Sequence, residues 1–156
     1  MSLDVKAAIS SATLGENCDN GGGAGDCEPG ANGCGFTCQE SNVQLFFETG
    51  AGTSVAVEIV SVTLHDAKSG AKVDSLAASE PQTWSASGKY GPWDEQLHPH
   101  SELRASYTLS APSWQAIGKS GNTYSRTYRL RVVVKIDGVA RTLESADLYR
   151  EAAIPT

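Results

Sequence analysis

The sequence of 156 residues lacks the features of several large protein classes. It contains no apolar run approaching the roughly 18 residues that a membrane-spanning helix needs, so no membrane span is predicted. The motifs GxSxG and HExxH and a phosphate-cradling glycine loop are also absent. Asp94 and Glu95 are adjacent, so on an extended strand they would point apart and could not flank one glycosidic bond. We therefore expect a protein that is not an enzyme.

Positive charge is scarce. The formal net charge is −6, and the first 50 residues carry all of it, because they hold seven acids and one base while the remaining 106 residues hold 11 of each. Phosphate contacts need a basic surface, so no nucleic-acid partner is expected. One outward row of bases is too small to change this expectation, and its simplest interpretation is a solvated sheet face. The row consists of Arg129, Arg131 and Lys135.

Cysteine is missing from the last 118 residues, and all four cysteines lie in one stretch near the N-terminus. This stretch, residues 16–41, is rich in glycine and acidic residues and has no apolar pattern. An even number of cysteines in such a segment predicts two disulfides that replace a core the segment lacks. Three pairings are possible, and we favour the one in which each bond closes a short loop. That pairing joins Cys18 to Cys27 and Cys34 to Cys38.

The predicted disulfides imply an oxidising compartment. We therefore expect an extracytoplasmic location, which could be the periplasm, the outer surface or the medium. The chain starts with Met1-Ser2-Leu3-Asp4, which is neither the basic nor the apolar region of a secretory signal. We expect the first three residues to be an expression leader and a secretory signal, if there was one, to have been removed.

The clearest pattern in the sequence predicts a β-hairpin at residues 124–145. Apolar and polar side chains alternate from Tyr128 to Ile136, which is typical of a half-buried strand. Asp137-Gly138 then supplies the two positive-φ positions of a type I′ turn, and alternation resumes in residues 139–143. The apolar face needs cover from a second layer, because a two-stranded ribbon alone is marginal in water.

The rest of the chain predicts short strands separated by turns. Alternation indicates strands at residues 5–15, 42–49, 54–66, 72–76 and 102–110. The apolar phase changes within residues 54–66, which predicts a β-bulge or a strand that passes to the opposite sheet. Residues 77–101 are expected to be irregular, with a helical turn near Trp114 and a short strand or a tail at the end. Seven or eight strands predict one all-β domain over residues 1–156, a two-sheet antiparallel immunoglobulin-like sandwich with the cysteine stretch inserted after the first strand.

Residues 43–148 resemble the immunoglobulin-like domains of secreted and envelope-attached bacterial proteins. The resemblance lies in the Trp-bearing middle segment, in the strand SYTLS and in the hairpin around Asp137-Gly138. Antibody domains differ in having a cysteine pair between the sheets, whereas all four cysteines here precede the predicted second strand. The resemblance implies a fold, and by itself it implies no chemistry.

Two regions could hold a metal ion, although we expect no cofactor. Residues 16–32 offer hard oxygen ligands for calcium, among them Asp19 and Asp26, but EF-hand spacing is absent. The cysteine spacing does not match the paired CxxC units of zinc sites. His98 and His100 would point to one side of an extended segment, which suggests copper or zinc, but the spacing specifies no third ligand.

Aromatic residues gather in the polar stretch 77–101. Exposed rings on a β-sandwich can form a flat platform on which sugars stack, and Asp94 and its neighbours could bond the hydroxyls. The alternative is that some of these rings fill the core. The group consists of Trp84, Tyr90 and Trp93, with Trp114 farther along the chain.

These patterns predict a non-catalytic binding or structural and adhesion module of the cell envelope, with a protein or a glycan as its partner. A protein-interaction module would use a sheet edge or the basic row. A carbohydrate-binding module would use the aromatic group, and a metal-binding periplasmic protein would use His98 and His100.

Overall fold

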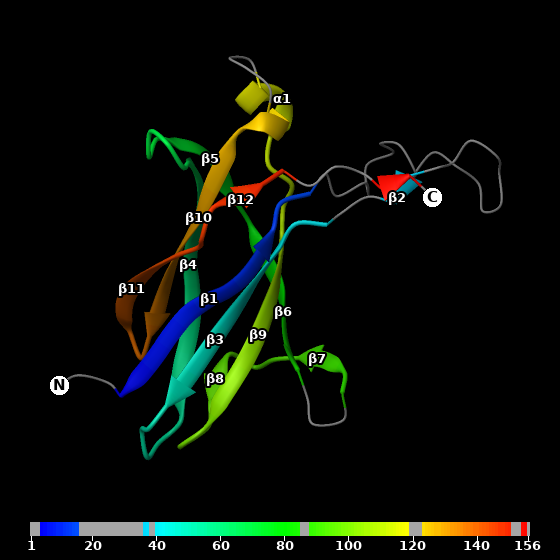
Figure 1. The fold of residues 1–156 in the computed structure, drawn as a ribbon. Helices are drawn as coiled ribbons and strands as arrows, with labels where there is room; N and C mark the ends of the chain where they lie inside the picture. Colours follow the sequence, from blue (N-terminus) through cyan, green and yellow to red (C-terminus); the bar gives the residue numbers. More distant parts are fainter. Residues whose placement is uncertain are drawn as a thin grey trace.

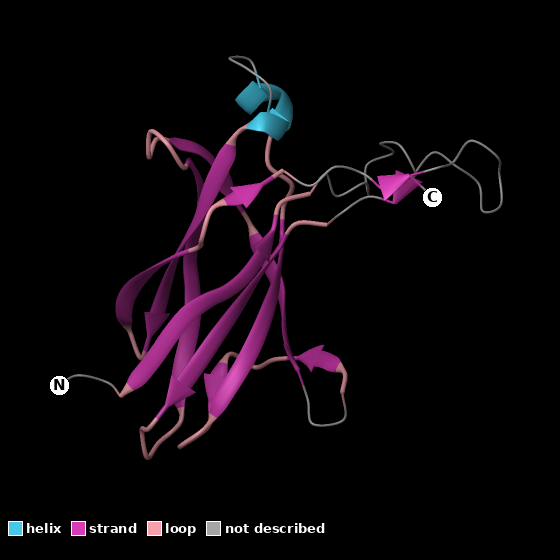
Figure 2. Ribbon diagram, in the orientation of Figure 1, coloured by secondary structure: helices cyan, strands magenta, loops and turns pink. Residues whose placement is uncertain are grey.

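The computed structural model describes residues 4–15, 40–84, 88–118 and 123–150, together with the backbone of residues 36–37 and 154–155. The described strands form two main antiparallel sheets that lie one over the other (Figures 1 and 2). The first sheet has the order β1-β3-β9-β6-β7. Its strands are β1 (Val5–Thr13), β3 (Asn42–Thr49), β9 (Glu102–Leu109), β6 (Ala78–Trp84) and β7 (Tyr90–Pro92).

The second sheet has the order β11-β10-β4-β5, with β12 added beside β10 and β8 beside β4. Its strands are β4 (Val55–Asp66), β5 (Lys72–Leu76), β8 (Gln96–Leu97), β10 (Thr127–Ile136), β11 (Val139–Glu144) and β12 (Leu148–Tyr149). A separate short pair joins β2 (Phe36–Thr37) to β13 (Ile154–Pro155). The prediction of an all-β fold with two antiparallel sheets is confirmed.

The predicted hairpin is present at β10 and β11. Ile136 pairs with Val139, so the loop consists of Asp137 and Gly138, whose φ angles are +51° and +79°. Both values match the type I′ turn. The predicted inward side chains of β10, from Tyr128 to Ile136, are all fully buried.

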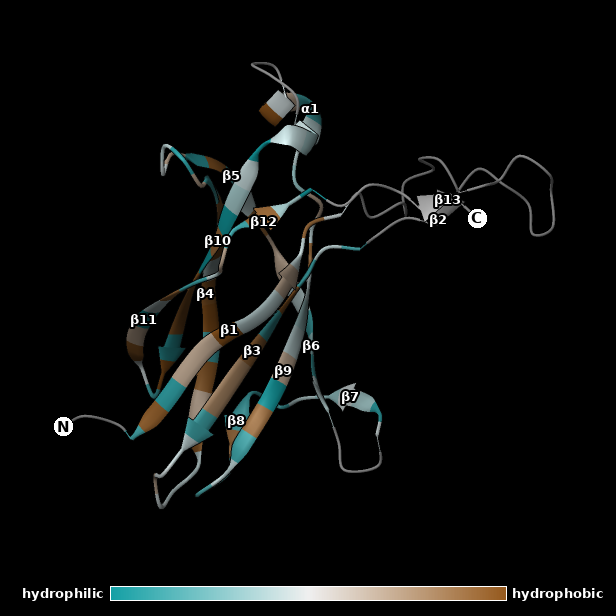
Figure 3. Ribbon diagram, viewed as in Figure 1, coloured by the Kyte–Doolittle hydropathy of each residue, from teal (hydrophilic) through white to brown (hydrophobic). Residues whose placement is uncertain are grey.

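The core lies between the two sheets. Hydrophobic and hydrophilic residues alternate along β1, β3 and β9 in Figure 3, which is the pattern of strands with one face buried. From the first sheet, β3 and β9 contribute most of the core, and β4 and β10 cover it from the second. The largest fully buried side chains are Tyr128, Phe47, Leu14, Leu45, Leu64, Leu97, Leu109, Leu130 and Ile136.

The phase change in β4 is a β-bulge. Val133 pairs with Ser61 and Val134 with Ile59, so Val60 is an extra residue, and its side chain is 50% exposed. Val57 and Val62, on either side of the bulge, are both buried. The bulge therefore lets two out-of-phase apolar runs face the same core, and β4 stays beside β10 along its length.

The prediction that residues 77–101 are irregular is wrong. This stretch contains β6, β7 and β8, and β6 pairs with β9 although it includes Pro81. The register shifts between Ser79 and Gln82, so Pro81 lies in a bulge where a ladder N–H is not needed. Its carbonyl accepts a hydrogen bond from Trp93 N, and Glu80 in the same bulge has φ +50°.

One end of the sandwich is closed by α1 (Trp114–Ile117) and the 3₁₀ turn η4 (Thr123–Ser125). Trp114 Nε1 donates a 3.0 Å hydrogen bond to the buried Gly15 carbonyl, and the Arg150 guanidinium lies 4.9 Å from the Trp114 ring centre. In the described ranges, no helix has the length and apolar character needed to span a membrane.

Candidate functional site

The outward side of the first sheet carries three aromatic side chains and one arginine. Ala8 pairs with Phe46 and Phe46 pairs with Arg104. The pairing of Thr83 with Ala105 brings the next residue of β6, Trp84, beside Arg104. Neighbouring strands lie about 4.8 Å apart, so the row from Phe46 to Trp84 spans roughly 10 Å. We call this surface the aromatic face, and its defining residues are Phe46, Trp84, Tyr90 and Arg104.

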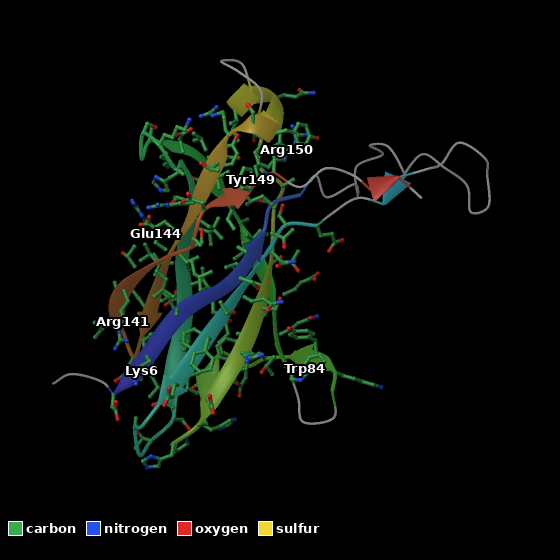
Figure 4. All side chains as sticks on the ribbon, viewed as in Figure 1. Lys6, Trp84, Arg141, Glu144, Tyr149 and Arg150 are labelled. Atoms are coloured by element: carbon green, nitrogen blue, oxygen red, sulfur yellow. The ribbon has the colours of Figure 1, made fainter. Side chains whose placement is uncertain are left out.

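Trp84 and Tyr90 form an exposed pair at one end of the aromatic face. They are opposite each other on β6 and β7, and their side chains are 52% and 42% exposed. Their ring centres are 5.0 Å apart with an angle of 70° between the planes. Trp84 lies beside β7, on the side of the molecule away from Arg141 and Glu144 (Figure 4). The two rings therefore form a corner rather than the flat platform that we predicted.

Two adjoining hollows extend from this corner across the sheet. The first is lined by Trp84, Phe46, Arg104, Leu103 and Glu102. The second shares Phe46 and Arg104 with the first, and the rest of its lining is polar and uncharged. These further residues are Ser10, Ser11 and Gln44. The aromatic face therefore combines apolar rings with hydroxyl and amide groups.

Arg104 differs from the other five arginines. Each of those donates a hydrogen bond to a carboxylate, a hydroxyl or a carbonyl or forms an ion pair. Within the described ranges, the exposed Arg104 guanidinium has no hydrogen-bond or ion-pair partner. Thr83 Oγ1 donates to the backbone carbonyl of Arg104, and this bond does not involve the Arg104 side chain. Its N–H groups are therefore available to a ligand.

Trp93, which we predicted as part of the aromatic group, lies in the core. It is 7% exposed, and its ring packs against Phe47 and Tyr107 with centre distances of 5.9 and 6.3 Å. Its Nε1 donates to the carbonyl of Gln96 at 3.1 Å. Trp114 is also buried, in edge-to-face contact with Tyr128. Neither ring offers a face for stacking.

The polar residues after Trp93 build a turn. Asp94 is exposed, and its Oδ1 accepts a 3.1 Å hydrogen bond from the backbone N–H of Gln96. Glu95 has φ +60°, and its Oε2 accepts a 2.9 Å bond from the Tyr107 hydroxyl. Burial and the Glu95 carboxylate raise the pKa of Tyr107. The carboxylates of Asp94 and Glu95 thus already accept hydrogen bonds from groups within the protein.

The metal-binding hypothesis concerns two histidines after Trp93. His98 and His100 are both exposed, and His100 has φ +51°. Among the residues that the structure describes, no three His, Cys, Asp or Glu side chains lie together as a possible metal site. His65 is buried, with Nε2 at 2.9 Å from Thr63 Oγ1 and Nδ1 at 3.2 Å from the Gly70 carbonyl.

The predictions for the cysteine stretch lie outside the described residues. They concern the disulfides and the possible calcium ligands Asp19 and Asp26. The pairing of β2 with β13 shows that the C-terminal end of this stretch lies beside the C-terminal tail.

Two of the three bases of the basic row form ion pairs with neighbouring carboxylates. Arg129 Nε donates to Asp147 at 2.7 Å, and both Arg129 and Arg131 reach Glu144, at 3.4 and 3.6 Å. Lys135 lies opposite Glu58 in the register of β10 and β4. This is the pattern of a solvated sheet face.

Sequence reasoning missed Phe46 and Arg104. The alternation in NVQLFFET already places Phe46 on the side opposite the buried Leu45 and Phe47. An aromatic side chain on the outward side of a strand was therefore a usable signal. Arg104 gives no such signal, because any outward position on a strand can carry an arginine.

Comparisons with known proteins add little to this description. No protein family model matches the chain, and no curated protein matches it. Among solved structures, the chain is similar to an uncharacterized beta-sandwich protein from Clostridium difficile 630. The TM-score is 0.46 and the sequence identity 7%, and the alignment covers 94% of this chain and 88% of that chain.

Proposed function

We propose that this protein is a non-catalytic, extracytoplasmic binding module that holds a carbohydrate chain on the aromatic face. The observation that carries this proposal is the exposed corner of Trp84 and Tyr90, which continues into hollows lined by Phe46 and Arg104. Clustered exposed rings are unusual on a soluble surface and mark binding sites. Carbohydrate binding is compatible with an adhesive role, in which the partner would be a glycan on a cell surface.

The geometry of the corner selects the form of the carbohydrate. A sugar ring has an apolar face that stacks on an aromatic ring and a rim of hydroxyls that needs polar partners. One ring of the corner can stack on the sugar while the other, turned by 70°, contacts its edge. Such a corner fits a single glycan chain better than the flat surface of a crystalline polymer.

The basic row is the weaker candidate surface. Its arginines already pair with Glu144 and Asp147, so a protein partner would have to displace internal ion pairs. The aromatic face requires no such exchange.

The immunoglobulin-like assignment is part of the proposal and is supported by strand order. In their order across the sheet, β1, β3, β9 and β6 take the positions of strands A, B, E and D of an immunoglobulin domain. β4, β10 and β11 take those of C, F and G. The extracytoplasmic location rests on the predicted disulfides. Oxidised protein from the native host should have a mass lower than the reduced chain by the hydrogens of its four thiols.

Affinity electrophoresis against a panel of neutral and acidic polysaccharides tests carbohydrate binding. We expect retardation by at least one polymer, and we expect Trp84→Ala and Tyr90→Ala each to abolish it. Tyr149→Ala is the matched control, because Tyr149 is 60% exposed and lies on β12 in the other sheet. Migration that no polymer changes would refute the proposal, as would equal losses from Trp84→Ala and Tyr149→Ala.

A further inference from the structure

We propose that the carbohydrate is acidic, and that Arg104 binds the carboxylate of a uronic acid residue in it. This inference rests on the proposed function, because it assigns the class of sugar that the same face takes. It follows from the position of Arg104 in the row between Phe46 and Trp84, from its lack of a partner, and from the charges of its neighbours.

Arg104 has the donors that a carboxylate requires. A guanidinium presents its N–H groups in a planar fork that bonds both oxygens of a carboxylate at once. The fork is exposed and makes no bond within the described ranges, whereas the arginines of the basic row and Arg126 already hold carboxylates. A ligand carboxylate would therefore complete at Arg104 the interaction that these arginines make within the protein.

The second hollow fits the acidic group. Among the described residues that line it, Arg104 is the one with a charge, and the others are Ser10, Ser11, Gln44 and Phe46. Ser10 Oγ donates to the backbone carbonyl of Gln44. The side-chain amide of Gln44 and the hydroxyl of Ser11 are therefore left for the ligand. A carboxylate here would have one cation and several neutral donors around it, and no acid is among the described residues that line the hollow.

Glu102 fixes the direction of the sugar chain. It lines the first hollow, together with Trp84, and belongs to a row in which Lys6 pairs with Glu48 and Glu48 with Glu102. Its carboxylate would repel a second carboxylate. The acidic sugar therefore lies over the second hollow, and the sugar that stacks on Trp84 lies in the first, with its hydroxyls toward Glu102.

The net charge of the chain makes the test specific. At −6 the protein does not attract polyanions through its overall charge. Binding to an acidic polymer would therefore report a local site, and it should weaken with salt as an exposed ion pair does.

The experiment compares three acidic polysaccharides, polygalacturonate, alginate and hyaluronan, each with its carboxyl-reduced, neutral form. Isothermal titration of the full chain measures binding. We expect at least one acidic polymer to bind about tenfold more tightly than its reduced form, because the reduced form lacks the carboxylate that Arg104 binds. Arg104→Gln should remove the difference, and Arg104→Lys should keep part of it. Arg129→Gln, on the other sheet, is the matched control and should keep all of it.

The outcomes separate this inference from the proposed function. If none of the three polymers binds more tightly than its reduced form, or if Arg104→Gln preserves the preference, the acidic assignment is wrong while Trp84-dependent glycan binding stands. If neither acidic nor neutral polymers bind, the proposed function itself fails.

Discussion

The hydroxyl of Tyr107 donates a 2.9 Å hydrogen bond to Oε2 of Glu95. This contact ties the inward face of β9 to the turn that leads into β8, and the backbone carbonyl of Glu95 accepts a further bond from Val57 N. The two bonds hold Glu95 at φ +60°, an unfavourable value for a residue with a side chain. The turn after Trp93 is thereby fixed to both sheets.

Tyr107 should make the protein sensitive to alkali. Burial, helped by Glu95, raises the pKa of Tyr107 above its value of about 10 in the unfolded chain. A group whose pKa is raised on folding contributes stability that is complete below about pH 10 and is lost as the pH rises further. The free energy of unfolding, measured with urea between pH 7 and 11, should thus decline above pH 10.

In Tyr107→Phe this decline should be smaller, and at pH 7 the variant should lose about 1–2 kcal/mol through the missing hydrogen bond. Part of the decline should remain, because burial also raises the pKa of Tyr128. An unchanged alkaline decline in Tyr107→Phe would contradict the assignment.

Asp66 should make the protein sensitive to acid. Hydrogen bonds from the Ser69 backbone and from Arg126 lower the pKa of Asp66 to about 2. Because the pKa is lower in the folded state, this stability is present above about pH 4 and is lost as the pH falls toward 2. We expect Asp66→Asn to cost about 1–2 kcal/mol at pH 7, measured by urea unfolding, since Arg126 is partly exposed and solvent screens the pair.

Asp147→Asn is the control for that measurement. It removes the partner of Arg129 at 2.7 Å, but both side chains are about half exposed, so the loss should be small. Equal losses from the two asparagine variants would show that the Asp66 contacts have no special weight.

Alanine replacement should lower the free energy of unfolding strongly at Trp93 and hardly at all at Trp84. Trp93→Ala leaves a cavity beside Phe47 and Tyr107 and should cost about 3–5 kcal/mol of unfolding free energy. Trp84→Ala removes an exposed ring and should stay within about 0.5 kcal/mol. Guanidinium unfolding checks both, and a large loss in Trp84→Ala would show that this ring is structural.

Gly138→Ala should weaken the β10–β11 hairpin. Gly138 has φ +79°, where an added side chain is strained, so we expect a loss of about 1–2 kcal/mol in urea unfolding. Gly91→Ala is the matched control, because Gly91 lies in β7 outside the positive-φ region and an added Cβ there meets no atom within 4 Å. A loss in Gly91→Ala as large as in Gly138→Ala would remove the φ explanation.

Much of the fold was predictable because alternation is a local property. The inward residues of β10, the type I′ turn at Asp137-Gly138 and the change of apolar phase in β4 all follow from residues a few positions apart. That the phase change is a bulge, and not a passage to the opposite sheet, is decided by the pairing of β4 with β10. The strand β6 was not predictable in this way. Pro81 and the lack of alternation argue against a strand, and only pairing with β9 on either side of a bulge overrides them.

The sequence by itself determined which side chains could serve a binding site, since it contains the exposed aromatic pair and an arginine on an alternating strand. Tertiary structure decided which of them meet. Trp84, Trp93 and Trp114 look alike as residues, yet packing buries two and leaves one exposed. Phe46 and Arg104 become neighbours because β3 pairs with β9, a contact between residues far apart in the chain. Alternation fixes the side of a strand on which a residue lies, but only the order and register of the strands determine its neighbours there.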